Sequence, residues 1–164
     1  MIFGMTTFTQ VHVVLSLIGI FAGLVVTFGL LMAKRLDGWT AFFLVTTVLT
    51  SVTGFFFPFH GFTPAIGVGI VSLVVLAIAI FARYGRKLAG ASRWIYVVTA
   101  MLALYLNVFV LIVQLFQKVQ ALKALAPTQS EPPFLIAQLG AFALFVVLTI
   151  FAVIRFRQRL DGVG

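Results

Sequence analysis

The chain has 164 residues, of which 63% are hydrophobic and 9% charged, and its net charge is +8. Soluble domains carry roughly 25% charged residues, so a soluble fold of this composition would have too few polar groups to cover its surface. The sequence contains no cysteine, which excludes disulfides, thiolate metal sites and thiol catalysis.

Five apolar stretches are long enough to cross a bilayer. A hydrocarbon core about 30 Å thick needs roughly 20 apolar residues in a helix, and none of the five stretches contains Lys, Arg, Asp or Glu. Because backbone groups in lipid must be paired within the segment, helices are favoured over strands. We therefore predict an all-α integral membrane protein with one transmembrane domain over residues 1–164. Its spans are expected at about 10–33, 39–57, 64–82, 94–116 and 134–154, with an outer loop or interfacial helix at about 117–133.

The first predicted span carries a stripe of small residues. Gly19, Gly23 and Thr27 recur every four residues, and small residues at this spacing let two membrane helices approach closely. We interpret the stripe as a packing face within the chain. Formation of a homodimer through the same face is the alternative.

Two histidines are predicted at the same membrane face. Gln10 and His12 lie near the start of the first span, and His60 lies just beyond the end of the second, antiparallel span. Two facing histidines are typical of bis-histidine haem ligation, and also of a proton relay or a metal site. Two ligands alone under-specify a metal, so we predict no cofactor. Haem b or a quinone bound near His12 and His60 is the alternative.

The basic residues indicate the direction of the spans, because they gather on alternate connections. Such an asymmetry places the richer side in the cytoplasm. It predicts an outside amino terminus and a cytoplasmic carboxyl terminus in a bacterial-type inner membrane. The clusters do not form one polar face, so membrane lipids are expected as partners and nucleic acid is not. One side has Lys34, Arg35, Arg83, Arg86, Lys87, Arg93, Arg155, Arg157 and Arg159, and the other has only Lys118 and Lys123.

The turn between the first two spans is predicted at Asp37 and Gly38, a residue pair that favours tight turns.

The fourth predicted span carries two amides on one face. Asn107 and Gln114 are seven residues apart, which is close to two helical turns. Asn107 is expected near the middle of the membrane, where an unpaired amide is costly. We interpret Asn107 as a partner in an interhelical hydrogen bond. A ligand pocket, or a transporter or channel path along the Asn107 and Gln114 face, is the alternative.

The start of the fifth span adds two more polar residues. Glu131 precedes Pro132 and Pro133 and suits a helix N-terminus, and Gln138 follows about two turns later. The sequence lacks the common hydrolase and phosphate-binding motifs, so the function is expected to be non-catalytic. We predict action through a partner membrane protein, a lipid or a small ligand at an outer polar pocket. Its candidate residues are Gln10, His12, His60, Asn107, Gln114, Glu131 and Gln138.

Overall fold

The computed structural model describes residues 7–32, 34, 36–56, 64–128 and 130–161. Within these ranges all regular structure is helical, which confirms the predicted all-α fold. The helices in chain order are α1 (Thr7–Leu31), α2 (Asp37–Gly54), α3 (Pro64–Ile80), the π-helical η1 (Phe81–Gly85), α4 (Ser92–Lys118), α5 (Gln120–Leu125) and α6 (Pro132–Asp161).

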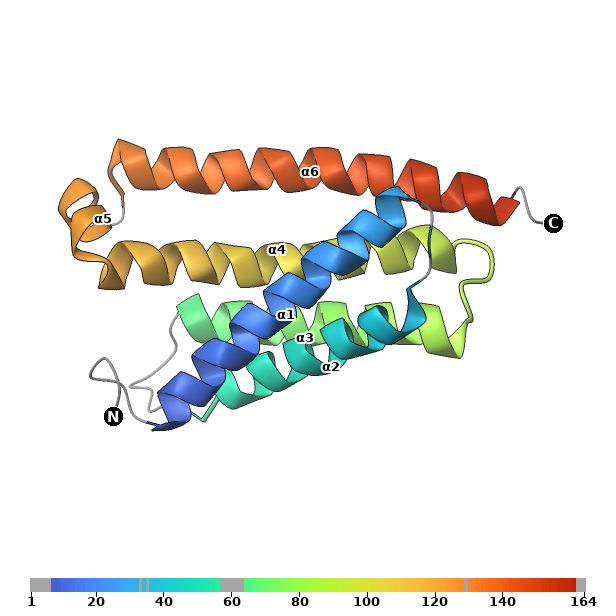
Figure 1. Cartoon of the computed structure of the whole chain (residues 1–164), viewed down its shortest axis with the longest axis horizontal. Helices are drawn as coiled ribbons and strands as arrows, with labels where there is room; N and C mark the ends of the chain where they lie inside the picture. The colour runs from blue at the N-terminus through green and yellow to red at the C-terminus, as the bar shows by residue number, and fades with distance from the viewer. Residues whose placement is uncertain (1–6, 33, 35, 57–63, 129, 162–164) are drawn as a thin grey trace.

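The five long helices lie alongside one another in an elongated bundle (Figure 1). Helix α3 contacts both α2 and α4, and α4 also packs along α6. Helix α1 runs diagonally across the bundle, from the side of α2 toward the end of α6 (Figure 1). The two ends of the bundle differ in charge. We call one the basic end, with Lys34, Arg83, Arg86, Lys87, Arg93 and Arg155, and the other, with Lys118 and Lys123, the opposite end.

Four helical segments are long and apolar enough to span a membrane: Gln10–Leu31, Ile66–Gly85, Ser92–Phe116 and Pro132–Phe156. They correspond to the first, third, fourth and fifth predicted spans. Helix α2 corresponds to the second predicted span but is not among them. It begins at Asp37, and its sequence of 18 residues includes several hydroxyl side chains that lower its mean hydropathy.

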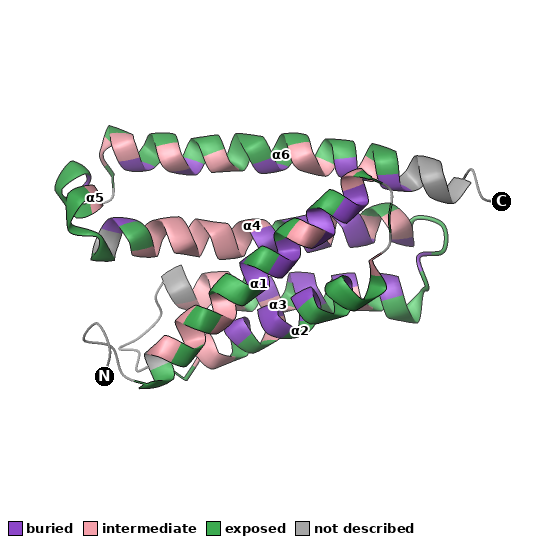
Figure 2. Ribbon diagram, in the orientation of Figure 1, coloured by how far each residue is buried: buried purple, intermediate pink, exposed green. Residues whose placement is uncertain are grey.

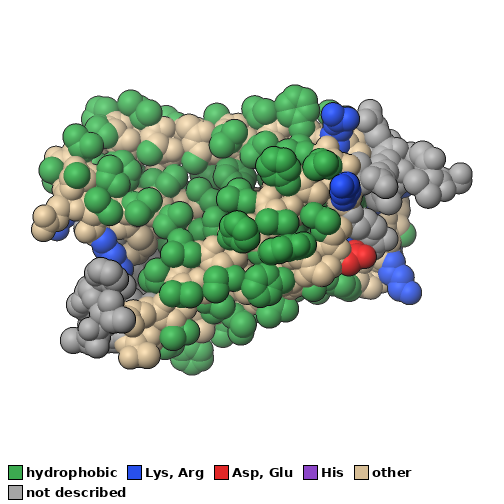
Figure 3. Space-filling model, in the orientation of Figure 1, with side chains coloured by type: hydrophobic (Ala, Val, Ile, Leu, Met, Phe, Trp, Pro, Cys, Tyr) green, Lys and Arg blue, Asp and Glu red, His purple; other side chains and the backbone are tan. Residues whose placement is uncertain are grey.

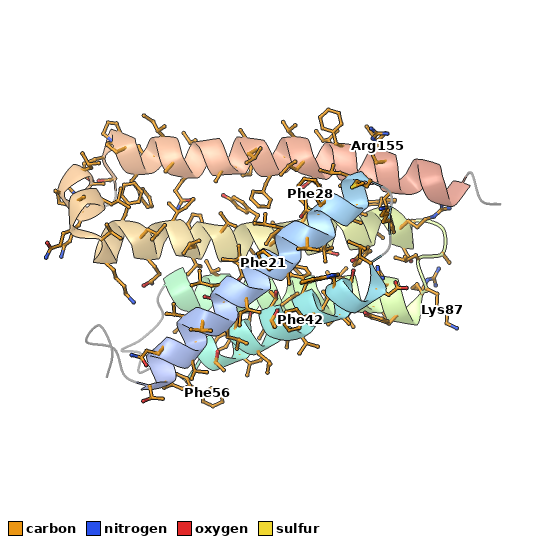
Figure 4. All side chains as sticks on the ribbon, in the orientation of Figure 1. Phe21, Phe28, Phe42, Phe56, Lys87 and Arg155 are labelled. Atoms are coloured by element: carbon orange, nitrogen blue, oxygen red, sulfur yellow. The ribbon has the colours of Figure 1, made fainter. Side chains whose placement is uncertain are left out.

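Apolar side chains dominate the outside of the bundle. They cover its middle in the view of Figure 3, with basic groups toward the two ends. Phe21, Phe28 and Phe42 point outward (Figure 4), and Phe28 is 69% exposed. Hydroxyl groups such as those of Thr40 and Thr47 lie inside instead. This distribution suits a protein whose solvent is hydrocarbon, and it would promote aggregation in water.

The densely packed core occupies the half of the bundle next to the basic end (Figure 2). On α1 every residue of the main core cluster lies at or after Ile20, and on α4 every one lies at or before Leu104. The following stretch of α4, residues 105–114, is only half-buried. A smaller cluster of Phe116, Ala126 and Phe134 closes the opposite end. The middle of the opposite half is therefore the less tightly packed part of the described bundle.

The prediction that Asp37 and Gly38 form a turn is wrong. Both residues belong to the first turn of α2, and the chain reverses before them, where Leu36 adopts a left-handed conformation with φ 44° and ψ 57°. A carboxylate in the first turn of a helix is favoured by the helix dipole. Asp37 has a second stabilising contact, an ion pair with Arg83.

The connection after α4 bends at Val119, whose φ of −84° and ψ of 118° end the helix. The short helix α5 follows and ends at Leu125, two residues before Pro127. Proline cannot continue a helix because it lacks the backbone N–H. Helix α6 then begins at Pro132.

The stripe of small residues on α1 lies against other helices of the same chain. A Cβ added at Gly19 would stand 3.2 Å from Thr46 Oγ1 of α2, and one at Gly23 would stand 2.6 Å from Leu104 Cδ1 of α4. The hydroxyl of Thr27 donates to the carbonyl oxygen of Gly23 at 2.8 Å, so it needs no outside partner. This face of α1 is therefore occupied by intramolecular contacts.

We predict that Gly23→Leu destabilises the bundle by about 1–3 kcal/mol, the range for overpacked cores. The new side chain would overlap Leu104 and the ring of Phe43. Gly140→Leu is the matched control, because an added Cβ at Gly140 meets no atom within 4 Å. Thermal unfolding in one detergent compares the two variants. An unchanged Tm for Gly23→Leu would contradict the close helix contact.

Candidate functional site

His12 joins the start of α1 to the end of α2. Its Nδ1 lies 2.8 Å from Thr53 Oγ1. The Thr53 hydroxyl also lies 2.7 Å from the carbonyl oxygen of Leu49, one turn earlier on α2, to which it can donate. A histidine that binds a metal through one ring nitrogen commonly has its other ring nitrogen hydrogen-bonded to a nearby group, as Nδ1 of His12 is to Thr53.

The other residues predicted beside His12 are less fully defined. Gln10 is half-buried on the same helix. His60 lies outside the described residues, so its approach to His12 stays a prediction. Among the described side chains, no group of three or more His, Asp or Glu residues is arranged to hold a metal ion.

Asn107 lies about one helical turn beyond Leu104 on α4. Leu104, three residues earlier, packs against Gly23 of α1, and residues three apart share a helix face. The amide nitrogen Nδ2 of Asn107 is buried and has no hydrogen-bond partner within the described ranges. Gln114, two turns later on that face, is half-buried. A buried donor without a partner carries a desolvation penalty, so an added hydrogen-bond acceptor would be held firmly here.

Gln138 lies in a different interface, between α6 and α4. Its Nε2 donates to the carbonyl oxygen of Phe109 at 3.3 Å, whereas its buried Oε1 has no partner among the described residues. The side of α4 that faces α6 carries Tyr105, whose ring lies 5.8 Å from that of Phe142. Asn107 comes two residues after Tyr105, which corresponds to a rotation of about 200° around the helix axis. The side chain of Asn107 therefore points away from α6. The structure does not bring Asn107 and Gln138 to one face.

Glu131 makes its hydrogen bonds within its own loop. Its carboxylate accepts from the Thr128 hydroxyl at 2.7 Å, from the Thr128 N–H at 3.1 Å and from the Ser130 N–H at 3.1 Å. These bonds lower the pKa of Glu131, and the Thr128 hydroxyl contributes most. The backbone carbonyl oxygen of Glu131 accepts from the N–H groups of Phe134 and Leu135. Glu131 therefore organises the start of α6.

A buried charge at the basic end was not among the predicted site residues. Arg83 in η1 is 3% exposed, donates from Nη2 to Asp37 Oδ1 of α2, and stacks 5.1 Å from the ring centroid of buried Tyr96 in α4. From its place in the sequence, Arg83 indicates only the direction of the spans. One signal was present: Asp37 is one of only three acidic residues, and it was predicted at the same membrane face as Arg83.

The backbone around Arg83 departs from α-helical geometry. The Arg86 N–H bonds to the Phe81 carbonyl oxygen at 2.9 Å, an i to i+5 bond, and Leu88 N–H bonds to the Ala82 carbonyl oxygen at 3.0 Å. Such π-helical turns are rare and occur frequently at functional sites. Here the turn places a cation against α2 and α4 at the basic end.

Comparisons with protein-family models, curated proteins and solved structures found no match for this chain.

We predict that removal of Asp37 destabilises the protein more than removal of Arg83. The side chain of Arg83 is 2% exposed and that of Asp37 is 73% exposed. Asp37→Ala leaves a buried guanidinium without its carboxylate, which costs about 3 kcal/mol. Arg83→Met keeps an apolar chain of similar length and leaves Asp37 hydrated, so the loss is smaller.

Thermal unfolding of both single variants and the double variant in one detergent measures this coupling. The double variant is expected to resemble Arg83→Met. A loss in the double variant equal to the sum of the single losses would show that the two residues act independently.

Proposed function

We propose that the chain forms five membrane spans, with α2 as the additional one. The support is the distribution of side chains on α2, which places hydroxyl groups inside the bundle and apolar groups on the outside. Its hydroxyl residues Thr40, Thr47 and Ser51 are buried in the bundle. Its 18 residues extend about 27 Å as a helix, close to the hydrocarbon thickness of about 30 Å. The apolar residues facing outward are Trp39, Phe42, Val45, Leu49 and Val52.

The proposed orientation puts the basic end in the cytoplasm of a bacterial-type inner membrane and the amino terminus outside. Lys87 and Arg155 lie at one end of the bundle, and Phe56 lies at the other (Figure 4). The opposite end has only Lys118 and Lys123 as described basic residues. Positive residues are retained on the cytoplasmic side of membrane proteins, which supports this direction.

We propose that the protein works by binding a small ligand or lipid at the Asn107 and Gln114 face of α4, open toward the outer side. The buried, unpartnered Nδ2 of Asn107 carries the proposal. A suitable ligand has a hydrogen-bond acceptor, such as a carbonyl or ester oxygen, on an apolar body. The half-buried residues 105–114 surround the amide with mainly apolar side chains that would contact this body.

A redox cofactor is the second candidate. The imidazole of His12 contacts Thr53 through Nδ1, and its Nε2 is the ring nitrogen that would bind haem iron; a quinone carbonyl could accept from Asn107. Visible absorbance of the purified protein separates these cases. A Soret band lost in His12→Ala would favour haem, and quinone in the lipid extract would favour the quinone.

We predict that single cysteines will report the orientation without background, because the chain has no native cysteine. In intact cells a membrane-impermeant maleimide should label Lys123→Cys. It should label Lys87→Cys only after permeabilisation. Both positions are exposed, so each site reacts once it is reached. The reverse labelling pattern would overturn the proposed direction.

We predict that Asn107→Leu removes a bound small molecule or lipid. Mass spectrometry of extracts from purified wild-type and variant protein measures the bound molecules, and thermal unfolding measures stability. A molecule enriched in the wild type and lost in Asn107→Leu supports the proposal. Equal extracts together with a raised Tm would contradict it, because Asn107 would then be only a buried amide whose removal stabilises the bundle. Leu102→Ala, at an exposed position of α4, is the control.

A further inference from the structure

A cavity of about 340 Å³ lies at the basic end, between the first turns of α4 and the last turns of α6. Residues 90–91 form one edge. Arg93 and Trp94 stand on the α4 side, and Val153 and Phe156 on the α6 side. The volume falls within the range of about 300–1,000 Å³ for small-molecule sites. It is separate from the Asn107 face, which lies farther along α4 toward the opposite end.

The lining combines one cation with apolar walls. Val97, Val153 and Phe156 are apolar, and Phe156 packs against the ring of Tyr96 at 6.3 Å between centroids. Arg93 supplies a guanidinium, which can bind phosphate through two parallel N–H donors. Trp94 is 51% exposed, and tryptophan is enriched at membrane–water interfaces. This lining matches a molecule with an anionic head and a hydrocarbon tail.

The charge around the cavity favours an anionic molecule. Arg155 is adjacent to the lining residue Phe156 on α6 and lies at the basic end (Figure 4). Exposed Arg86 and Lys87 belong to the connection that leads into α4. The carboxylate of Asp37 at this end pairs with Arg83, outside the cavity lining. Basic residues at a membrane surface attract anionic lipids.

We propose that this cavity binds an anionic phospholipid of the adjacent leaflet. The phosphate is held by Arg93, and one acyl chain contacts Val97, Val153 and Phe156. The apolar walls would contribute nothing to a free phosphate ion, which is why a lipid is the occupant. The leaflet is cytoplasmic in the proposed orientation, but the site does not depend on that direction.

Fluorescence of Trp94 tests the proposal. The chain has two tryptophans, so Trp39→Phe leaves Trp94 as the reporter. This parent protein is reconstituted in phosphatidylcholine vesicles with a small fraction of brominated phosphatidylglycerol or of brominated phosphatidylcholine. Bromine quenches tryptophan on contact. We expect a preference of about fivefold for the anionic lipid, which corresponds to roughly 1 kcal/mol for one basic side chain near the surface.

Two pairs of variants separate the cavity from the general charge of the surface. Arg93→Gln should abolish the preference, whereas Arg86→Gln, at an exposed position outside the cavity, should retain it. Val153→Phe should reduce quenching by filling the cavity, whereas Ile154→Phe, on the exposed face of α6, should not.

Three results would overturn the proposal. The first is equal quenching by the two brominated lipids in the parent protein. The second is an unchanged preference in Arg93→Gln with normal elution of the variant in size-exclusion chromatography. The third is loss of the preference on addition of inorganic phosphate at constant ionic strength, which would mean that the site binds a free anion.

Discussion

A polar group in hydrocarbon must find its hydrogen-bond partner inside the protein, and this constraint governs the bundle at every level. It explains why the hydroxyls of α2 donate to carbonyl oxygens one turn earlier, as Thr46, Thr50 and Thr53 do. It also explains why these residues point inward while phenylalanine and valine cover the outside. The same constraint makes a buried amide nitrogen without a partner informative, because such a group is expensive to retain.

The two halves of the bundle differ in how closely their helices pack. Near the basic end, Arg83 connects α2, η1 and α4 through Asp37 and Tyr96, and the main core cluster surrounds these helices. Toward the opposite end, α1 leaves α4 to follow α2, and the side chains of α4 become half-buried (Figures 1 and 2). The described bundle is therefore packed unevenly along its length, densely beside Arg83 and less densely around residues 105–114.

The sequence predicted the helices well and their mutual contacts poorly. Long apolar runs require helices in lipid, so four of the predicted spans match helices of sufficient length and hydropathy. The depth of a residue in the membrane also follows from its position within an apolar run of the sequence. Rotation about the helix axis does not, because nearly every face of these helices is apolar. For that reason Asn107 and Gln138 were predicted as residues of one pocket although they occupy different interfaces, and the buried position of Arg83 was not anticipated.

Helix α6 has a further consequence for the protein in its membrane. Its 30 residues extend about 45 Å, so its charged last turns, from Arg155 onward, continue past an apolar stretch that matches a hydrocarbon thickness of about 30 Å. Only 11% of its apolar window is buried, against 33–39% for the other three candidate spans. A long helix held along one flank can accommodate hydrophobic mismatch by tilting. Changes in bilayer thickness should therefore move α6 more than its neighbours, and would alter its spacing from α4 along the seam that contains Gln138.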